Sequence, residues 1–499
     1  MSSILPLFIV IPLIGAFVVA LFDLIKDEDK KNRLADILSG TIGFILLILS
    51  ILILNEKGIY FMGTWKLPEG IVLVLDGFSG PIILITNLIA LICIIFSFNY
   101  MSNYNAKEKY YSLFLLMVAG MNGVVLTGDV FNLYVFLEVA SVASYALVGF
   151  GTMRKEIEAT FKYLVISSIG TAFMLLAIAL VYGFTRNLNM AYIASILADM
   201  EVPAGIYLAL GLFIIGFSIK AALMPFHAWL PDAHPSAPAP ISAMLSGVLI
   251  KSVGIYALIR IGYTVMGMNT GILPAMLRVL GVTSMMLGVL LALGQWDFKR
   301  LLAFHSVSQM GYIALGFGLA TPLGIIGGFF HLLNHSVFKS LLFLNSGSVF
   351  FRTKTRDLKE MGGINERMPV TGATSMIASL SIAGIPPFNG FWSKLVIVLA
   401  CIRSDHPLLA GWAILGSILT LASFLKVQRY AFIGKIKNNL DEIREAPFWM
   451  QFSMIFLAIL CVFMGFLLVP QISAVILEPA AKILTDSSAY IKIVLGGGL

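Results

Sequence analysis

Long apolar runs follow one another along the whole chain, and only short polar segments separate them. A membrane-spanning helix needs about 20 mostly apolar residues, and the sequence contains about fourteen such runs. They begin near Ile4, Leu34, Ile71, Tyr111, Asp129, Phe161, Ile206, Ile241, Leu273, Leu301, Gly324, Thr371, Leu408 and Phe448. We therefore predict an all-α polytopic membrane protein with about fourteen transmembrane helices, in which residues 1–499 form a single integral membrane module.

Two of the runs are interrupted by similar sequences. Pro225 opens the sequence PFHAW in the seventh run, and Pro387 opens the sequence PFNGFW in the twelfth. Each broken run is the fourth of a block of five, and blocks with an odd number of spans insert in opposite orientations. This pattern predicts two inverted five-helix repeats, approximately 111–262 and 273–433, each with one broken helix, and an amphipathic C-terminal tail over 470–499. Two unrelated proline kinks are the alternative.

The composition and the placement of charge support a membrane location. Hydrophobic residues make up 59% of the chain and charged residues 12%, whereas an ordinary soluble domain is about 25% charged. Of the 33 Lys and Arg residues we assign 20 to loops on one side, 5 to the spans, and 8, including Lys66 and Arg260, to loops on the other side. Cytoplasmic loops are rich in Lys and Arg, so both termini are expected outside.

Several function classes are excluded by composition. The net charge of +7 is spread over many short loops and forms no basic stripe, which argues against nucleic-acid binding. Cys93, Cys401 and Cys461 form no C-x-x-C pair, so a zinc ribbon, a cysteine-ligated cluster and a disulfide framework are excluded. The sequence also lacks Walker A and G-x-G-x-x-G motifs. We expect no cofactor, no metal and no redox site, and the energy source must be an ion gradient or another subunit.

The most informative residues are the few ionisable side chains inside the apolar runs. Glu138 is the only acid deep in such a run. The cations there are Lys220, Lys251, Lys339, Lys394 and Lys426. Lys251 lies near mid-membrane, and a charge at that depth costs about 2.5–3.5 kcal/mol, so several of them indicate a proton relay. Structural salt bridges are the alternative, and Lys426 is expected to reach the membrane interface.

Histidine titrates nearest to neutral pH and occurs at His227, His234, His305, His331, His335 and His406. His331, His335 and Lys339 are spaced i, i+4 and i+8, which places them on one helical face that could pass a proton. The two histidines also match half of a metal site, but no H-E-x-x-H motif and no second intramembrane acid accompany them. A hydrogen-bonded core pair is the other alternative.

Residues at the breaks and at the ends of runs are assigned gating or accessory roles: Pro225, His227, His234, Pro387 and Asp129. At the breaks the backbone loses its helical hydrogen bonds, which a membrane tolerates only where protein or water replaces them. For Asp129 and Asp76, helix capping or solvation is the alternative.

These motifs resemble the antiporter-like subunits of complex I and of the Mrp sodium/proton antiporters. The resemblance covers nearly the whole chain and rests on the run around Glu138, Lys220 before MPFHAWLPDAH, Lys251 in SGVLIKS and Lys394 in GFWSK. The chain is most similar to the D-type subunit of Mrp antiporters, which also occurs in membrane-bound hydrogenases and their sulfur-reducing relatives. Lys394 replaces the glutamate of one complex I subunit, and the long lateral helix of the largest members is not seen after Pro470.

The resemblance implies a pair between Glu138 and Lys220, a hydrated axis continued by Lys251 and Lys394, and His331, His335 or Lys339 as a bridge between the halves. The expected function is proton translocation in a multisubunit cation/proton antiporter or redox-driven pump of a prokaryotic cytoplasmic membrane. Expected partners are other membrane subunits of an Mrp or hydrogenase-type complex, H+, Na+ and the lipid bilayer, and any redox chemistry belongs to those subunits. A self-sufficient transporter of a small solute and a membrane enzyme that binds haem or quinone are the alternatives.

Overall fold

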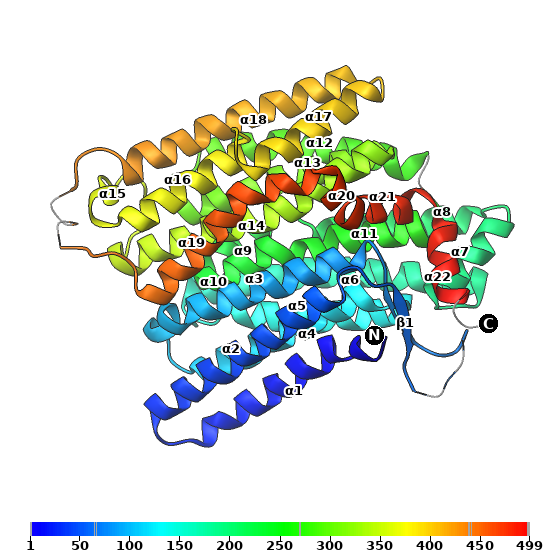
Figure 1. Cartoon of the computed structure of the whole chain (residues 1–499), viewed down its shortest axis with the longest axis horizontal. Helices are drawn as coiled ribbons and strands as arrows, with labels where there is room; N and C mark the ends of the chain where they lie inside the picture. Colours follow the sequence, from blue (N-terminus) through cyan, green and yellow to red (C-terminus); the bar gives the residue numbers. More distant parts are fainter. Residues whose placement is uncertain are drawn as a thin grey trace.

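The computed structural model describes residues 2–496 except 64, 66, 269, 270, 438, 439 and 441. Lys66, counted above as an outer cation, and the last three residues of the tail lie outside the described residues. The described chain is almost entirely helical, and most of its long helices run along the long axis of the molecule (Figure 1). The prediction of an all-α polytopic protein is confirmed.

Ten helical segments of the described residues are long and apolar enough to cross a bilayer. They contain α1 (Leu7–Leu21), α2 (Glu28–Leu52), α3 (Ser79–Tyr100), α4 (Lys107–Leu126), α5 (Val130–Val148), α6 (Arg154–Thr185), α10 (Ala239–Met244) with its continuation, α12 (Ile272–Leu293), α18 (Pro407–Val427) and α19 (Phe448–Phe463). Shorter or more polar helices accompany them: α7 (Met190–Asp199), α8 (Ala204–Lys220), α9 (Leu230–Ser236), α13 (Phe298–Gly318), α14 (Pro322–Thr353), α15 (Ile364–Arg367), α16 (Pro369–Ala383) and α17 (Asn389–Arg403). The figure of about fourteen spans stays a prediction.

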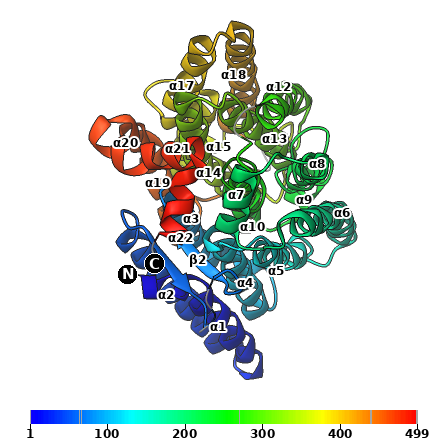
Figure 2. The same ribbon diagram turned by 90° about the vertical axis from the view of Figure 1, so that its right-hand side faces the viewer.

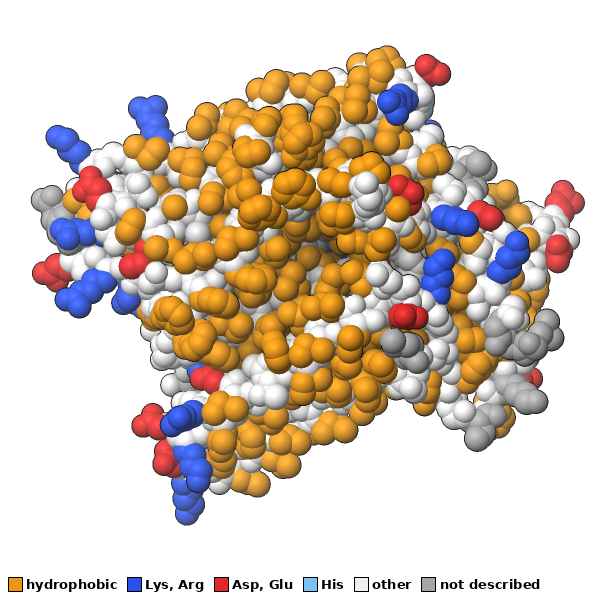
Figure 3. All heavy atoms as spheres, viewed as in Figure 1, with side chains coloured by type: hydrophobic (Ala, Val, Ile, Leu, Met, Phe, Trp, Pro, Cys, Tyr) orange, Lys and Arg blue, Asp and Glu red, His pale blue; other side chains and the backbone are white. Residues whose placement is uncertain are grey.

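The surface in Figure 3 divides into an apolar middle and two charged ends. Orange apolar side chains cover the middle of this face, and Lys and Arg gather mainly at the end drawn on the left. Large hydrophobic residues such as Phe17, Phe161 and Ile418 are more than half exposed. Both chain termini lie toward the opposite, right-hand end (Figure 1). An apolar belt between two charged ends is the surface that a bilayer requires.

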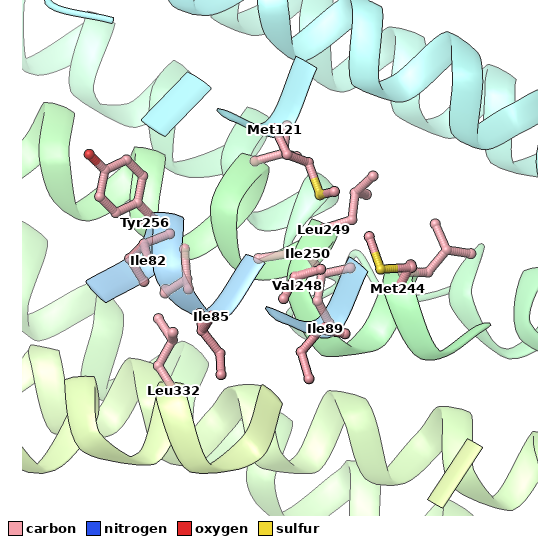
Figure 4. Packing of buried hydrophobic residues seen from close by; sticks show 14 of the residues in the cluster. Ile82, Ile85, Ile89, Met121, Met244, Val248, Leu249, Ile250, Tyr256 and Leu332 are labelled. Atoms are coloured by element: carbon pink, nitrogen blue, oxygen red, sulfur yellow. The ribbon is translucent and has the colours of Figure 1, made fainter. Parts of the chain in front are cut away.

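One span lies entirely inside the molecule and forms its centre. It continues from α10 through η4 (Leu245–Tyr256), α11 (Ala257–Ile259) and η5 (Arg260–Val265), and all of its residues are buried. Isoleucines of α3 and Leu332 of α14 pack around it (Figure 4). Because η4 and η5 are π-helical, this span is wider than an α-helix, and such segments are frequent at functional sites.

The third apolar run does not begin as a helix. Residues of β1 (Gly58–Phe61) pair antiparallel with β2 (Val72–Leu75), and α3 starts only at Ser79. The prediction of a helical span from Ile71 is therefore wrong in its first residues. The sequence of β2 is wholly apolar, and a short apolar run cannot be assigned to strand or helix from periodicity alone.

The tail consists of α20 (Pro470–Ile476), α21 (Glu478–Thr485) and α22 (Ser487–Leu495). α21 buries Ile483 and Leu484 while Lys482 is exposed. The tail crosses the end of the molecule where the termini lie, with α21 against α14 and η5, and α22 against α7, η5 and β1 (Figure 2). It thereby joins segments from distant parts of the sequence.

Candidate functional site

Lys220 is the last residue of α8 and points toward α5 and α6. Its Nζ donates hydrogen bonds to Ser141 Oγ (2.8 Å), Tyr145 OH (3.3 Å) and Ser167 Oγ (2.5 Å). Glu138 Oε1 lies 3.8 Å from the same nitrogen and has no hydrogen-bond partner among the described residues. The side chain of Lys220 is 3% exposed and that of Glu138 is 30% exposed. The structure therefore brings the predicted partners together, but hydroxyl groups, not the carboxylate, make the short contacts.

The break after α8 replaces helical hydrogen bonds with bonds from side chains. Residues 221–229 are not helical, and Pro225 is exposed. The indole of Trp229 donates to the carbonyl of Ile219 (2.8 Å), and the backbone N–H of Met224 donates to Ser284 Oγ (2.9 Å). The freed backbone is thus satisfied by protein groups, as a break at membrane depth requires.

The two histidines at this break occupy different surroundings. His227 is half-buried, with its ring 6.2 Å from that of Phe304. His234 is fully buried against Phe343, and neither of its ring nitrogens has a hydrogen-bond partner among the described residues. No hydrogen bond or ion pair of the described residues links either histidine to Glu138 or Lys220. Their gating role stays a prediction.

Lys251 lies in the middle of the π-helix η4 and is 2% exposed. Its Nζ donates to the carbonyls of Ser246 and Gly247, at 2.6 Å for Gly247, in the preceding turn. No ion pair among the described residues includes it. Among the described residues, Lys251 therefore meets neutral carbonyl groups and has no counter-ion.

His331, His335 and Lys339 lie along one face of α14, and all three are fully buried. The two imidazole rings are nearly parallel, with centroids 6.2 Å apart. Lys339 Nζ donates to the carbonyl of Leu302 on α13 (2.5 Å), whereas neither ring nitrogen of His335 has a partner among the described residues. No group of three potential metal ligands occurs in the described part of the chain.

His331 connects this face to two other helices. Its Nδ1 lies 2.9 Å from Ser393 Oγ on α17, and its Nε2 lies 3.2 Å from Gln309 Oε1 on α13. The Tyr312 ring of α13 lies 5.5 Å from the His331 ring and 4.7 Å from Lys394 Nζ, so it stands between the histidines of α14 and the lysine of the second broken helix.

Lys394 lies at the second break, where α16 ends and α17 begins shortly after Gly384. Gly384 has a φ of 78°, the left-handed conformation that ends many helices. Lys394 Nζ donates to the carbonyl of Ile382 (2.7 Å) and to Ser417 Oγ (3.3 Å), and it lies 4.7 Å from the centre of the Tyr312 ring. The lysine borders a cavity of about 320 Å³. Pro387 is exposed at the break.

The segment that contains these side chains matches a known protein family. Residues 127–420 match the family described as NADH:quinone oxidoreductase/Mrp antiporter, transmembrane. The chain belongs to this family. The matched segment contains Glu138, Lys220, Lys251, Lys339, Lys394 and the six histidines.

Individual relatives match this antiporter-like chain over almost its full length. The D-type subunit of a Na(+)/H(+) antiporter from Alkalihalophilus pseudofirmus is 33% identical, over 98% of this chain and 99% of that protein. A chain in the structure of the Mrp complex from Dietzia sp. is 28% identical, with a TM-score of 0.90 and 99% of each chain covered. A chain of the membrane-bound sulfane sulfur reductase, an archaeal respiratory membrane complex, is 30% identical, with a TM-score of 0.88, 99% of this chain and 100% of that chain covered.

A second buried ion pair of this antiporter-like chain was not expected. Arg260 Nη1 and Nη2 donate to the two carboxylate oxygens of Asp76 at 2.7 and 2.8 Å, and both side chains are almost completely buried. Burial would raise the pKa of Asp76, but the guanidinium charge and hydrogen bonds hold that pKa below its ordinary value. The rings of Phe78, Tyr256 and Tyr490 lie 5.1–5.4 Å from the guanidinium. The assignment of Arg260 to a loop was wrong, because Arg260 begins η5 inside the buried central span. Its partner lies 184 residues away, so no local pattern in the sequence indicates the pair.

Asp129 and Asp76, the acids at the ends of two runs, accept hydrogen bonds at helix starts, and Asp76 also forms the ion pair with Arg260. Asp129 is the N-cap of α5 and accepts from the N–H of Asn132 (2.7 Å). Asp76 accepts from the N–H of Ser79 at the start of α3 (2.9 Å), but it is not solvated. For Asp129 the structure shows the capping contact and no contact with the relay residues among the described hydrogen bonds.

The polar residues that bind the lysines were not among the predicted site residues. Ser141 and Tyr145 follow Glu138 at i+3 and i+7, so the periodicity of α5 places all three on one face. Ser393 was detectable as the neighbour of Lys394. Ser167 and Gln309 carried no local signal, because other helices bring them to their partners.

Proposed function

We propose that this chain is a proton-translocating, antiporter-like membrane subunit of a multisubunit cation/proton antiporter or redox-driven ion pump. The observation that carries the proposal is the position of Lys220, which is bonded to three hydroxyl groups with Glu138 3.8 Å away. The relatives named for Na(+)/H(+) antiport and for membrane complexes support this assignment.

The proposed relay begins with a movement of Lys220 between the hydroxyl groups and Glu138. A lysine at the end of a helix needs only a rotamer change to exchange these partners. The movement alters the electrostatic repulsion at Lys251, which has no counter-ion of its own among the described residues, so Lys251 changes its protonation state in response. The movement of the Lys220 charge thus causes Lys251, in the central span, to bind or release a proton.

From Lys251 the relay continues into the second half. Lys339, His335 and His331 form the face of α14, and the Tyr312 ring lies next to both His331 and Lys394. Imidazole can take a proton at one nitrogen and release one from the other. Protons therefore pass between Lys251 and Lys394 along α14.

The same proposal covers topology and partners. We infer two inverted repeats, 111–262 and 273–433, because each contains one broken helix. The last span of each repeat also has π-helical turns, which are η4 and η5 in the first repeat and η6 (Gln428–Phe432) in the second. The Lys- and Arg-rich end faces the cytoplasm of a prokaryotic cell, and both termini lie outside. Other membrane subunits, H+ and Na+ are its partners.

The test replaces Lys251 within the complete complex. Lys251→Ala removes the titrating group, and Lys251→Arg keeps a charge that arginine, with a pKa above about 12, does not release. Both variants should reduce sodium-coupled pH changes in inverted membrane vesicles to background, while Lys57→Ala, an exposed lysine, should leave them unchanged. Near-normal transport by Lys251→Arg would show a structural counter-charge and overturn the relay. Purification of the chain alone as an active solute carrier would overturn the multisubunit assignment.

A further inference from the structure

Helix α13 contacts the central span and both helices of the second repeat that carry proposed relay residues. Its contacts are Leu302 O with Lys339 Nζ, Ser306 Oγ with Ser246 Oγ, Gln309 with His331, and the Tyr312 ring with Lys394. The partners lie on three other segments of the chain, η4, α14 and α17. Because α13 packs against these residues, its own titratable side chain could also carry protons.

His305 is the one histidine of α13, and the relay described above does not use it. It is fully buried, one turn after Leu302 and one turn before Gln309. Its Nε2 lies 2.8 Å from Ser423 Oγ on α18, and its ring packs 4.7 Å from that of Phe424. Nδ1 has no hydrogen-bond partner among the described residues. Buried polar groups are nearly always paired, so an unpaired ring nitrogen indicates a place for a proton or a water molecule.

The titratable groups that act on His305 come from three helices, and all are lysines: Lys339 of α14, Lys394 of α17 and Lys426 of α18. Lys426 follows Ser423 by three residues and donates to the carbonyls of Leu293 (2.7 Å) and Gln295 (2.6 Å) at the end of α12. His305 and Ser423 thus lie between two lysines, Lys339 and Lys394, and a third, Lys426, which binds the end of α12.

We propose that His305 is a further proton-carrying residue, which forms a branch from Lys339 to the seam between α13 and α18. This inference rests on the proposed function. The ammonium of Lys339 gives a proton to the free Nδ1 of His305, which leaves a neutral amine and an imidazolium. The imidazolium then passes its Nε2 proton to Ser423 Oγ as the serine hydroxyl releases its own proton to the neutral amine form of Lys426, which becomes an ammonium. One positive charge has then moved from Lys339 to Lys426, and the imidazole is neutral again with its proton on Nδ1.

The test compares His305→Gln with His305→Ala in the complete complex. Glutamine can keep a hydrogen bond to Ser423 but cannot titrate, whereas alanine removes both properties. If His305 carries protons, both variants should lower sodium-coupled transport at least ten-fold at every pH between 6 and 9, with normal assembly. His406→Gln, at the opposite end of α18, should match the wild type. Wild-type transport by His305→Gln would show that only the hydrogen bond matters and would overturn the proposal.

Two further variants keep the outcome decisive. If His305→Gln does not assemble, Ser423→Ala decides, because it interrupts the branch without changing the ring: reduced transport supports the branch and unchanged transport overturns it. Lys251→Ala separates this inference from the proposed function. Loss of transport in Lys251→Ala together with full transport in His305→Gln refutes only the branch, whereas full transport in both refutes the relay itself.

Discussion

Two ion pairs among the described residues, Arg260–Asp76 and Lys220–Glu138, differ in almost every physical respect. Arg260 and Asp76 make two parallel contacts of 2.7 and 2.8 Å, and their side chains are 5% and 0% exposed. Lys220 and Glu138 make one contact of 3.8 Å, and the carboxylate is 30% exposed. Three aromatic rings enclose the arginine, whereas three hydroxyl groups compete with Glu138 for the lysine.

The difference separates a fixed pair from a movable one. A guanidinium fits a carboxylate with two hydrogen bonds and does not release its proton, whereas an ammonium on a flexible stem can exchange partners and titrate. The Arg260–Asp76 pair joins the loop after β2 to η5 and to α22 of the tail through Tyr490. We infer that the Arg260–Asp76 pair stabilises the fold and that the Lys220–Glu138 pair takes part in transport.

The largest effect is expected from breaking the fixed pair. Asp76→Asn leaves the Arg260 charge buried without a counter-ion, which destabilises a protein by about 3–5 kcal/mol. The amount of folded chain in the purified complex should fall sharply, and its unfolding temperature should drop. As a control, replacing both residues by apolar ones, Asp76→Leu with Arg260→Met, should restore most of the stability. Normal stability of the single variant would show that the pair is not structural.

The next effect concerns the movable pair and should appear in transport alone. Glu138→Gln removes the charge that attracts Lys220, so sodium-coupled pH changes in vesicles should fall to background. Because the contact is long, the carboxylate is partly exposed and three hydroxyl groups still bind Lys220, assembly of the complex should persist. Glu158→Gln, which alters an exposed pair with Lys162 on α6, serves as the matched control. Wild-type transport by Glu138→Gln would refute the switch.

A smaller effect should follow acidification of the fixed pair. The pKa of Asp76 is below its ordinary value of about 3.9, so the stabilisation from the ionised carboxylate is complete above about pH 4 and is lost as the pH falls through the lower folded-state pKa. The difference in unfolding temperature between the wild type and the double apolar variant should therefore be constant from pH 8 to 5 and change only below about pH 4. A change between pH 7 and 5 would contradict a tightly held pair.

The smallest effect should come from the hydroxyl groups around Lys220. Ser141→Ala removes one of three acceptors, and the other two remain, so the loss should be no more than about 1.4 kcal/mol, or about ten-fold in transport rate. Ser144→Ala is a suitable control on the same helix, because its hydroxyl contacts Tyr163 and not Lys220. Complete loss of transport in Ser141→Ala would mean that the hydroxyl is part of the relay.

The class of the protein and most of the residues proposed for the relay could be predicted from the sequence alone. Apolar runs about 20 residues long specify spanning helices, and the scarcity of charge inside them singles out Glu138 and the buried lysines. Helical periodicity also placed His331, His335 and Lys339 on one face, and the two histidine rings do lie parallel there. These features are local, since they depend on residues within a few turns of one another.

Which groups meet is set by the packing of the helices. The sequence does not reveal that Asp76 binds Arg260, that Gln309 contacts His331, or that His305 faces Ser423, since each pair comes from different segments. Nor does it show that Lys251 stands in a π-helix or that β2 precedes α3. Apolar residues suit a strand, an α-helix and a π-helix alike, and packing against neighbours selects among them. The function of a buried charge depends on the partner it meets, and that partner is set by the fold.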